Sequence, residues 1–253
     1  MTISAYSFNQ FQIVLGKIST RAAYELQRWL KAQGGLAAVE RQRLIDYAYV
    51  LATKYGEATS ALAAEWYDQL AAAAGRTLPA AELAPTATYA ETAKAVNGVL
   101  KVSQNEEMLS GAVQRLVKMP GADTTLNNAI RDGAEVAWIP RGDTCAFCIA
   151  LASRGWVKAS KQLVKNGHAE HIHAHCDCTY EVRYDENTTV AGYDPDRYKA
   201  MYDEAPGRNS TQKINAMRRE FYAENADEIN AQKRSAYEKR VELNSSAAEE
   251  ADV

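Results

Sequence analysis

The sequence predicts a mainly α-helical protein that contains a small α+β metal-binding unit. Three observations support this fold class. The first third of the chain has apolar residues at helical spacing and no proline before Pro79. The segment from Cys145 to Cys178 holds every cysteine and histidine of the chain and lies between two strand-like runs. After residue 210, a long charged segment contains neither proline nor glycine.

The first two helices are predicted to form an antiparallel hairpin. Each has one apolar face, and the glycines at Gly34, Gly35 and Gly75 end them. Because a short glycine turn joins them, we expect the two faces to pack against each other. The apolar positions are Phe8, Phe11, Leu15, Ile18, Ala22, Leu26 and Trp29 in the first helix, and Leu44, Ala48, Leu51, Tyr55, Ala58, Leu62, Trp66 and Leu70 in the second.

We expect the chain to divide into a helical domain at 1–120, a Cys/His metal-binding α+β unit at 121–190, and a C-terminal helical tail at 191–253. Within the first part, prolines and small residues at 76–88 indicate a linker. A helix is expected to follow at 90–102.

The segment after residue 102 predicts two further helices. Ser103 and Glu106 have the spacing of a capping box, which predicts a helix that continues to Val117. Pro120 is expected to end that helix because proline lacks the amide that helical hydrogen bonding requires. Asp123 is expected to cap a short helix that runs to the glycine at position 133.

The metal-binding unit is predicted to be a strand–helix–loop–strand knuckle. The β-favouring run 134–139 ends at Pro140, and the run 179–184 alternates as a strand does, so the two strands could pair. Asp194, followed by proline, is expected to cap a further helix. The charged segment 211–243 is expected to be a solvated helix or one that docks on a partner.

The cysteines and histidines have the spacing of a zinc site. Cys145 and Cys148 lie three residues apart at the predicted start of a helix, so both thiols can face one ion. Cys176 and Cys178 lie two apart and face the same side of an extended segment. Thiolate and imidazole are the ligands that zinc prefers, so either four cysteines, or three cysteines with His173, can close a tetrahedral site. A closed site predicts a structural zinc ion.

Composition and expected location favour a metal site over disulfides for the clustered cysteines, and they argue against general nucleic-acid binding. The formal charge of −3 and the pI near 5.9 do not provide a basic surface overall. We expect no transmembrane segment, no targeting leader and a cytoplasmic origin, where clustered cysteines are more often metal ligands than disulfides. Two disulfides or buried thiols remain the alternative.

Enzymatic alternatives are also open. His168-Ala-Glu170 with the first cysteine pair imitates a zinc deaminase signature in reversed order. Two further alternatives are a redox Cys-x-x-Cys centre and a metal-dependent nuclease in which His173 or His175 activates water. His175, on the strand face opposite Cys176, is a weaker ligand candidate. No residue is assigned a catalytic or cofactor-binding role, and no small-molecule substrate is expected.

The sequence resembles phage head-morphogenesis proteins of the Mu F-like minor capsid family, in the branch found in phages and prophages of Gram-positive bacteria. The resemblance rests on Trp138, the Gly142-Asp143 turn, Cys145-Ala-Phe-Cys148, and His173-Ala-His-Cys176-Asp-Cys178. It extends to Glu65-Trp-Tyr67, Ala191-Gly-Tyr-Asp-Pro195 and Ile229-Asn-Ala-Gln-Lys-Arg234. The common family form has proline at position 174 and arginine at 177, where this chain has alanine and aspartate.

The resemblance implies a virion protein present in few copies near the portal. It would act in head assembly, in the host cytoplasm during assembly and in the phage head afterwards. Its expected partners are the portal, major capsid or scaffold protein, with packaged DNA contacted indirectly. Some relatives are described as capsid maturation proteases, so a protease or a nuclease-like enzyme is the alternative to a structural role.

Overall fold

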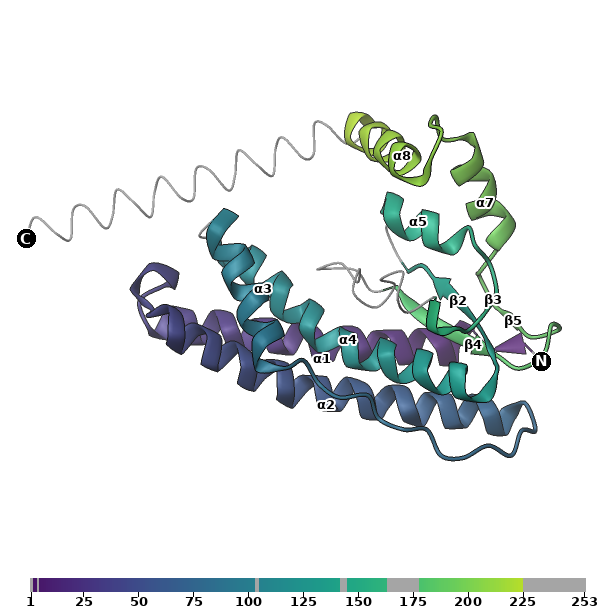
Figure 1. The fold of residues 1–253 in the computed structure, drawn as a ribbon, viewed down its shortest axis with the longest axis horizontal. Coiled ribbons are helices and arrows are strands. Elements are labelled where there is room, and N and C mark those ends of the chain that lie inside the picture. The colour runs from purple at the N-terminus through teal and green to yellow at the C-terminus, as the bar shows by residue number, and fades with distance from the viewer. Residues whose placement is uncertain (1, 4, 103–104, 142–144, 163–177, 225–253) are drawn as a thin grey trace, which may run out of the picture.

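The structure, a computed structural model, describes residues 2–3, 5–102, 105–141, 145–162 and 178–224. Figure 1 shows long helices side by side, with a small sheet and shorter helices at the end of the bundle nearest the N-terminus. This architecture confirms the expectation of a mainly helical protein with a small sheet. None of the described helices is both long and apolar enough to cross a membrane.

The predicted N-terminal hairpin is confirmed. Helices α1 (Ala5–Ala32) and α2 (Arg41–Ala73) are joined by a tight turn and a short 3₁₀ helix, η1 (Leu36–Ala38). Gly34 and Gly35 have φ angles of 87° and 95°, a backbone conformation that residues other than glycine rarely adopt. The turn therefore depends on the two glycines that the sequence places there.

Residues 76–88, which we call the strap, are non-helical as expected, but polar side chains fix their backbone against α2 and α4 (Glu106–Asp132). The Asn128 amide accepts a hydrogen bond from the Glu82 N–H at 2.9 Å and donates to the Glu82 carbonyl at 2.8 Å. The Thr124 hydroxyl accepts from the Ala84 N–H at 3.0 Å. A buried backbone needs such partners, so these polar residues explain how the strap lies on the helices.

Helix α3 (Tyr89–Val102) follows the strap and begins with a capping box. The Glu91 carboxylate accepts hydrogen bonds from both the amide and the hydroxyl of Thr88 at 2.8 Å. The Glu91 amide in turn donates to the Thr88 hydroxyl at 3.3 Å. This reciprocal pair fixes the point at which the strap becomes helical.

The capping box expected at Ser103 is wrong. Helix α4 (Glu106–Asp132) is capped by Asn105, whose side-chain oxygen accepts from the amide two residues on at 2.8 Å. Ser103 lies outside the described residues. Glu106, the expected partner in the box, instead accepts a hydrogen bond from the Leu36 amide at 3.0 Å. Its carboxylate therefore stabilises the hairpin turn, a contact that local spacing does not reveal.

The helix break expected at Pro120 is also wrong, because α4 continues through it to Asp132. A proline inside a helix costs about 3 kcal/mol. Tertiary packing offsets this cost: a Cβ added at Gly56 of α2 would lie 3.3 Å from the Pro120 ring, and the Thr59 hydroxyl donates to the Val117 carbonyl at 2.6 Å. Asp123 therefore lies inside a helix and caps none. Gly133, with φ of 67°, ends α4 as expected.

Two buried clusters fill the bundle. The helical core lies toward the hairpin turn and consists of aliphatic side chains; the sheet core lies where the helices meet the sheet. The helical core contains Ala22, Leu26, Leu30, Leu36, Leu44, Ile45, Ala48, Leu51, Val96, Val99, Leu109, Val113 and Val117. The sheet core contains, among others, Phe8, Phe11, Tyr67, Leu70, Leu126, Val136, Trp138, Ile139, Cys148, Cys178, Tyr180, Val182 and Val190. Helix α4 contributes to both, and the division into three domains stays a prediction.

The predicted pairing of the two strands is confirmed. Strand β2 (Glu135–Ile139) pairs antiparallel with β4 (Thr179–Arg183), with Trp138 opposite Tyr180 and Ile139 opposite Thr179. Strand β3 (Val157–Lys158) pairs with the other edge of β2, which gives the order β3-β2-β4. A separate two-stranded parallel pair joins β1 (Thr2–Ile3) to β5 (Thr189–Val190).

Three short helices cover the outer side of the sheet region (Figure 1). They are α5 (Ala146–Ala152), α7 (Pro195–Glu204) and α8 (Ser210–Glu224). Asp194 caps α7 as expected, because its side chain accepts hydrogen bonds from two amides of the first turn. The charged helix expected at 211–243 is described only to residue 224, and α8 buries Met217 against α5 and α7.

Candidate metal centre

Three of the five expected zinc ligands lie among the described residues. Cys145 is exposed, whereas Cys148 and Cys178 are buried. His173 and Cys176 lie outside the described residues, as do His168, His171 and His175. The expected ligand set therefore stays a prediction, and the structure places only the first cysteine pair and the last thiol.

The first cysteine pair lies at the start of α5. Pro140 follows β2 directly, and Cys145 is the N-cap residue of α5, in an extended conformation with φ of −69° and ψ of 157°. Its carbonyl accepts the first helical hydrogen bond, from Ile149, at 3.0 Å. Cys148 lies on the first turn, and only 1% of its surface is exposed. The helix start that the sequence predicts for this pair is confirmed.

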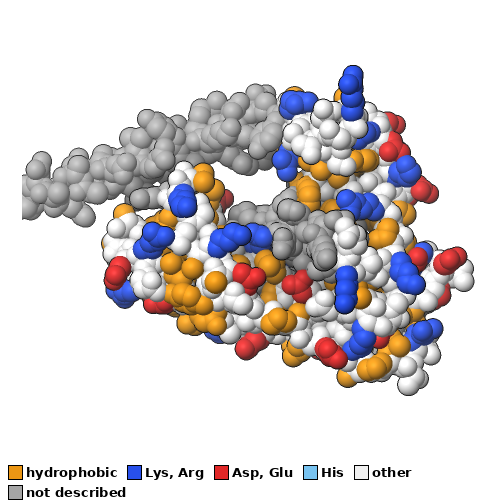
Figure 2. Space-filling model, viewed as in Figure 1, with side chains coloured by type: hydrophobic (Ala, Val, Ile, Leu, Met, Phe, Trp, Pro, Cys, Tyr) orange, Lys and Arg blue, Asp and Glu red, His pale blue; other side chains and the backbone are white. Residues whose placement is uncertain are grey.

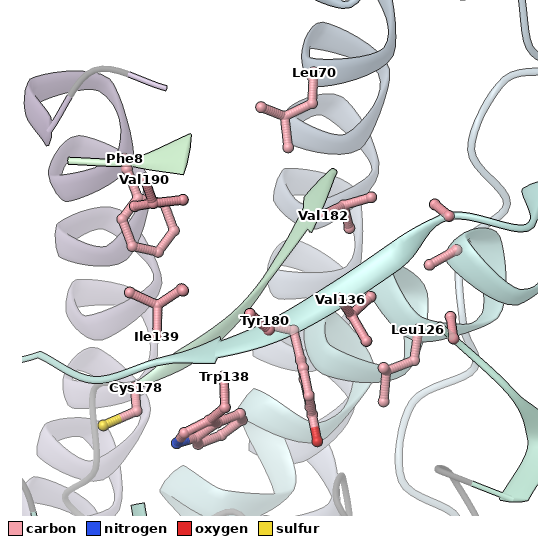
Figure 3. Close-up of a cluster of buried hydrophobic side chains, with 14 of the residues drawn as sticks. Phe8, Leu70, Leu126, Val136, Trp138, Ile139, Cys178, Tyr180, Val182 and Val190 are labelled. Carbon is pink, nitrogen blue, oxygen red and sulfur yellow. The ribbon is translucent and has the colours of Figure 1, made fainter. Parts of the chain in front are cut away.

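Cys178 immediately precedes β4, in the buried region where the ends of β2 and β4 meet. Since Ile139 and Thr179 are register partners, the end of β2 meets the beginning of β4, and Cys178 is 6% exposed beside them. Figure 3 shows Cys178 next to Trp138, with Tyr180 beyond it. The Trp138 and Tyr180 rings make an edge contact at 4.8 Å. Cys148 and Cys178 thus share one buried cluster, the sheet core.

The described thiols do not by themselves form a metal centre. Within the described ranges, no group of three or more histidine, cysteine, aspartate or glutamate side chains could hold an ion. The structure therefore brings Cys148 and Cys178 into the same core, but the zinc ion itself is left as a proposal. The protease and nuclease alternatives are likewise untested, because every histidine on which they depend lies outside the described residues.

A small cavity of about 30 Å³ lies beside Cys178, between α1, α4 and the sheet. Gln12, Trp138 and Thr179 are among the residues with polar groups that line it, and the Gln12 amide donates to the Thr179 hydroxyl at 3.2 Å. The Trp138 indole N–H is buried without a hydrogen-bond acceptor in the described part of the chain. A cavity of this size holds about one water molecule, which is too little for a substrate.

Glu181 is a buried carboxyl group that the sequence analysis missed. It is fully buried on β4, between residues whose side chains are also buried. The Trp66 indole of α2 donates to both carboxyl oxygens, at 3.2 and 3.1 Å, and the Val182 amide donates at 2.9 Å. Phe11 stacks on Trp66 at 5.2 Å and closes the site from α1.

Burial decides the ionisation of Glu181. Loss of solvation raises its pKa from 4.5 to about 8, although the hydrogen bonds from Val182 and Trp66 act in the opposite direction. The carboxyl group therefore prefers the neutral form in the folded protein at neutral pH. The signal in the sequence was weak: an acidic residue in the middle of an apolar strand, between Tyr180 and Val182.

One family model matches the chain: the model described as VG15 protein aligns with residues 2–205. The match covers more than half of the chain and runs from β1 to the residue after α7, so it includes the bundle, the sheet and α5. No curated protein and no solved structure matches the chain.

Proposed function

Because the chain belongs to the VG15 protein family, a family of viral and phage proteins, we propose that it is a minor capsid protein that acts in phage head assembly near the portal. The family match is the observation that carries this proposal. It covers the bundle and the sheet as one unit, and the Cys/His motif resembling head-morphogenesis proteins falls inside it. The proposed location is the phage head, and the proposed partners are the portal, major capsid or scaffold protein.

The architecture supports a role in which one part of the molecule holds another at a fixed distance. Helix α4 is continuous over 27 residues and contributes to both buried cores. Interiors packed in this way transmit displacement rather than absorb it. The bundle can therefore act as a stiff arm between a partner bound at the hairpin turn and one bound at the sheet end.

Co-assembly tests this proposal. The tagged chain would be expressed with the portal, scaffold and major capsid proteins encoded near its gene, and assembled heads would be separated from free protein by sedimentation. We expect the chain in the head fraction, at few copies per particle, and lost from it when the portal is omitted. If the chain stays with free protein while complete heads form, the proposal is wrong.

We also propose a structural zinc ion held by four of the residues Cys145, Cys148, His173, Cys176 and Cys178. The support is the convergence of Cys148 and Cys178 on one core from positions 30 residues apart in the chain. A bound zinc ion would cross-link the start of α5 to the segment that leads into β4. Structural zinc in small peptide sites contributes roughly 10–16 kcal/mol of apparent binding free energy, so such an ion would dominate local stability.

Metal analysis of the purified protein tests the zinc proposal. We expect one zinc ion per chain, and its loss in at least one of the variants Cys145→Ser and Cys178→Ser, because at most one of the five residues is not a ligand. Ala152→Ser is the matched control, because Ala152 is fully buried on α5 and its substitution adds a buried hydroxyl without removing a thiol. Zinc that persists in both cysteine variants, or is absent from the wild-type protein, would rule the site out. Chelation should also make residues 134–184 sensitive to protease.

A further inference from the structure

The exposed face of α1 is rich in basic residues, which the proposed function does not use. Lys17, Arg21, Tyr24, Arg28 and Lys31 are all exposed. Their spacing of three, four or seven residues puts them on one side of the helix. At 1.5 Å per residue, the row extends for about 21 Å along the helix axis. We call it the α1 basic face.

This face is strongly positive in a chain whose net charge is −3. The only acidic residue of α1 is Glu25, which is half-buried. Its carboxylate accepts hydrogen bonds from the Tyr55 hydroxyl at 2.6 Å and from Lys54 of α2 at 3.3 Å, as well as from Arg21 at 3.2 Å. Lys54 therefore compensates the one negative charge, and the four cations of the face remain in excess.

In the part of the chain that the structure describes, the face drawn in Figure 2 and helix α7 carry charges of both signs. On the face drawn in Figure 2, basic and acidic side chains are interspersed. Helix α7, for example, carries Arg197 and Lys199 together with Asp196, Asp203 and Glu204, and Lys199 pairs with Asp203. Net charge alone thus conceals a local concentration of positive charge on α1.

Tyr24 lies between two guanidinium groups. Arg21 and Arg28 have their guanidinium carbons 5.7 and 5.8 Å from the centre of the Tyr24 ring, while 49% of Tyr24 remains exposed. Cation–π contacts hold both arginines along the helix surface. A planar guanidinium held in this way can bind a phosphate through two parallel hydrogen bonds.

A further cation joins the face at its N-terminal end. Arg141, which follows β2 and Pro140, lines an open surface hollow together with Lys17, Arg21 and Tyr24. Gly16 also lines this hollow, and having no side chain it leaves room between α1 and the segment after β2. The basic surface therefore spans two parts of the fold.

We propose that the α1 basic face, extended by Arg141, binds the phosphate backbone of nucleic acid without reading its sequence. A linear row of cations interrupted by one exposed aromatic ring matches a polyphosphate chain, in which charges repeat at short, regular intervals. Acidic peptides are a different class of ligand and form the competing outcome of the test. The proposal does not rest on the role in head assembly, because the purified chain alone can be tested for it.

The test measures binding of labelled double-stranded and single-stranded DNA of equal length by fluorescence anisotropy, at salt concentrations from about 50 to 200 mM. Four or five phosphate contacts predict that the logarithm of the binding constant falls with the logarithm of salt concentration with a slope of about −4. Duplex binding that exceeds single-strand binding would assign the contact to phosphates. Single-strand binding that is lost in Tyr24→Ala would assign part of it to base stacking.

Two double variants locate the contact. Arg21→Gln with Arg28→Gln, and separately Lys17→Gln with Lys31→Gln, should each weaken binding at least about tenfold at low salt and reduce the slope by about two. The lysine pair takes no part in the Glu25 network, so it separates loss of binding from any local rearrangement. Arg197→Gln with Lys199→Gln on α7 is the matched control, because it removes the same charge and should change binding less than about twofold.

Three results would overturn the proposal: absence of binding at the lowest salt, an equal loss in the α7 control, or competition by polyglutamate as effective as competition by DNA. The first two would show that α1 makes no specific contribution. The third would show that the face binds acidic protein. A chain that binds DNA but fails to enter heads would leave this inference standing and remove only the head-assembly role.

Discussion

The helical core and the sheet core differ in what they bury. The buried residues of the helical core are alanine, valine, leucine and isoleucine, and half-buried Trp29, Tyr47 and Tyr55 pack against its edge. The sheet core contains aromatic rings and two thiols, and Glu181, a fully buried carboxyl group, lies against it through Trp66. Aliphatic packing is insensitive to pH and metal, whereas carboxyl groups and thiols respond to both. The two ends of one bundle should therefore respond to different conditions, which is a difference that mutation and titration can measure.

The largest effect is expected from the helical core. Leu26 is fully buried there, and Leu26→Ala should lower the free energy of unfolding by about 2–5 kcal/mol, through lost apolar burial and the cavity left behind. Urea unfolding followed by circular dichroism measures this change. Zinc content and the pH dependence of stability should remain those of the wild-type protein. A loss below about 1 kcal/mol would mean that this core collapses around the cavity.

The sheet core should lose stability as pH rises. Below pH 4.5 Glu181 is protonated in both the folded and the unfolded chain, so its contribution is complete. Between pH 4.5 and about 8 the unfolded chain releases the proton while the folded chain keeps it, and stability falls by up to about 1.4 kcal/mol per pH unit. Above the folded-state pKa of about 8 the contribution is lost.

Glu181→Gln isolates this effect, because glutamine keeps the shape of the side chain and cannot ionise. The free energies of unfolding of the wild-type and variant proteins would be compared between pH 5 and 9. We expect the variant to gain stability relative to the wild type as pH rises, by a few kcal/mol in total. If the free energies of unfolding of the two proteins change equally with pH, then Glu181 does not control the pH dependence of the sheet core.

A smaller effect is expected where the strap crosses the bundle. Asn128→Ala removes both hydrogen bonds to the backbone of Glu82 and leaves partly buried backbone groups without these partners, which should cost about 1–3 kcal/mol. Limited proteolysis should then cut within residues 76–88 sooner than in the wild type. Gln69→Ala, on an exposed part of α2, serves as the control. Equal cleavage rates in both variants would mean that other contacts fix the strap.

Features set by local sequence could be predicted, and those set by distant contacts could not. The hairpin follows from apolar spacing and two glycines, and the β2–β4 pairing follows from two strand-like runs around the cysteine segment. The continuity of α4 through Pro120 depends on Gly56 and Thr59, which lie some sixty residues away in the sequence. Glu106 was given a local role but binds the Leu36 amide. Proline and capping rules alone cannot anticipate such partners.

In the candidate site, too, some features could be predicted from the local sequence and others could not. The position of Cys145 at a helix start and of Cys178 at the beginning of a strand followed from residue pattern alone. The burial of Glu181 did not, because it results from Trp66 and Phe11 closing over the strand from two other helices. The α1 basic face was present in the sequence as a spacing of cations, but the net charge of −3 concealed it.

The smallest effect is expected at the junction of the two cores, where Gly121 of α4 meets Thr59 of α2. A Cβ added at Gly121 would lie 3.1 Å from the Thr59 carbonyl oxygen, so Gly121→Ala should force the helices apart and cost about 1 kcal/mol net of the better helix propensity of alanine. Gly98→Ala on α3 is the matched control, because no atom lies within 4 Å of its added Cβ. That variant should gain about 0.5–1 kcal/mol. Thermal unfolding of the two variants measures whether each substitution raises or lowers the stability of the protein. If Gly121→Ala also stabilises the protein, then α2 and α4 have room for the added methyl group. The two cores would then be less tightly joined than this short distance indicates.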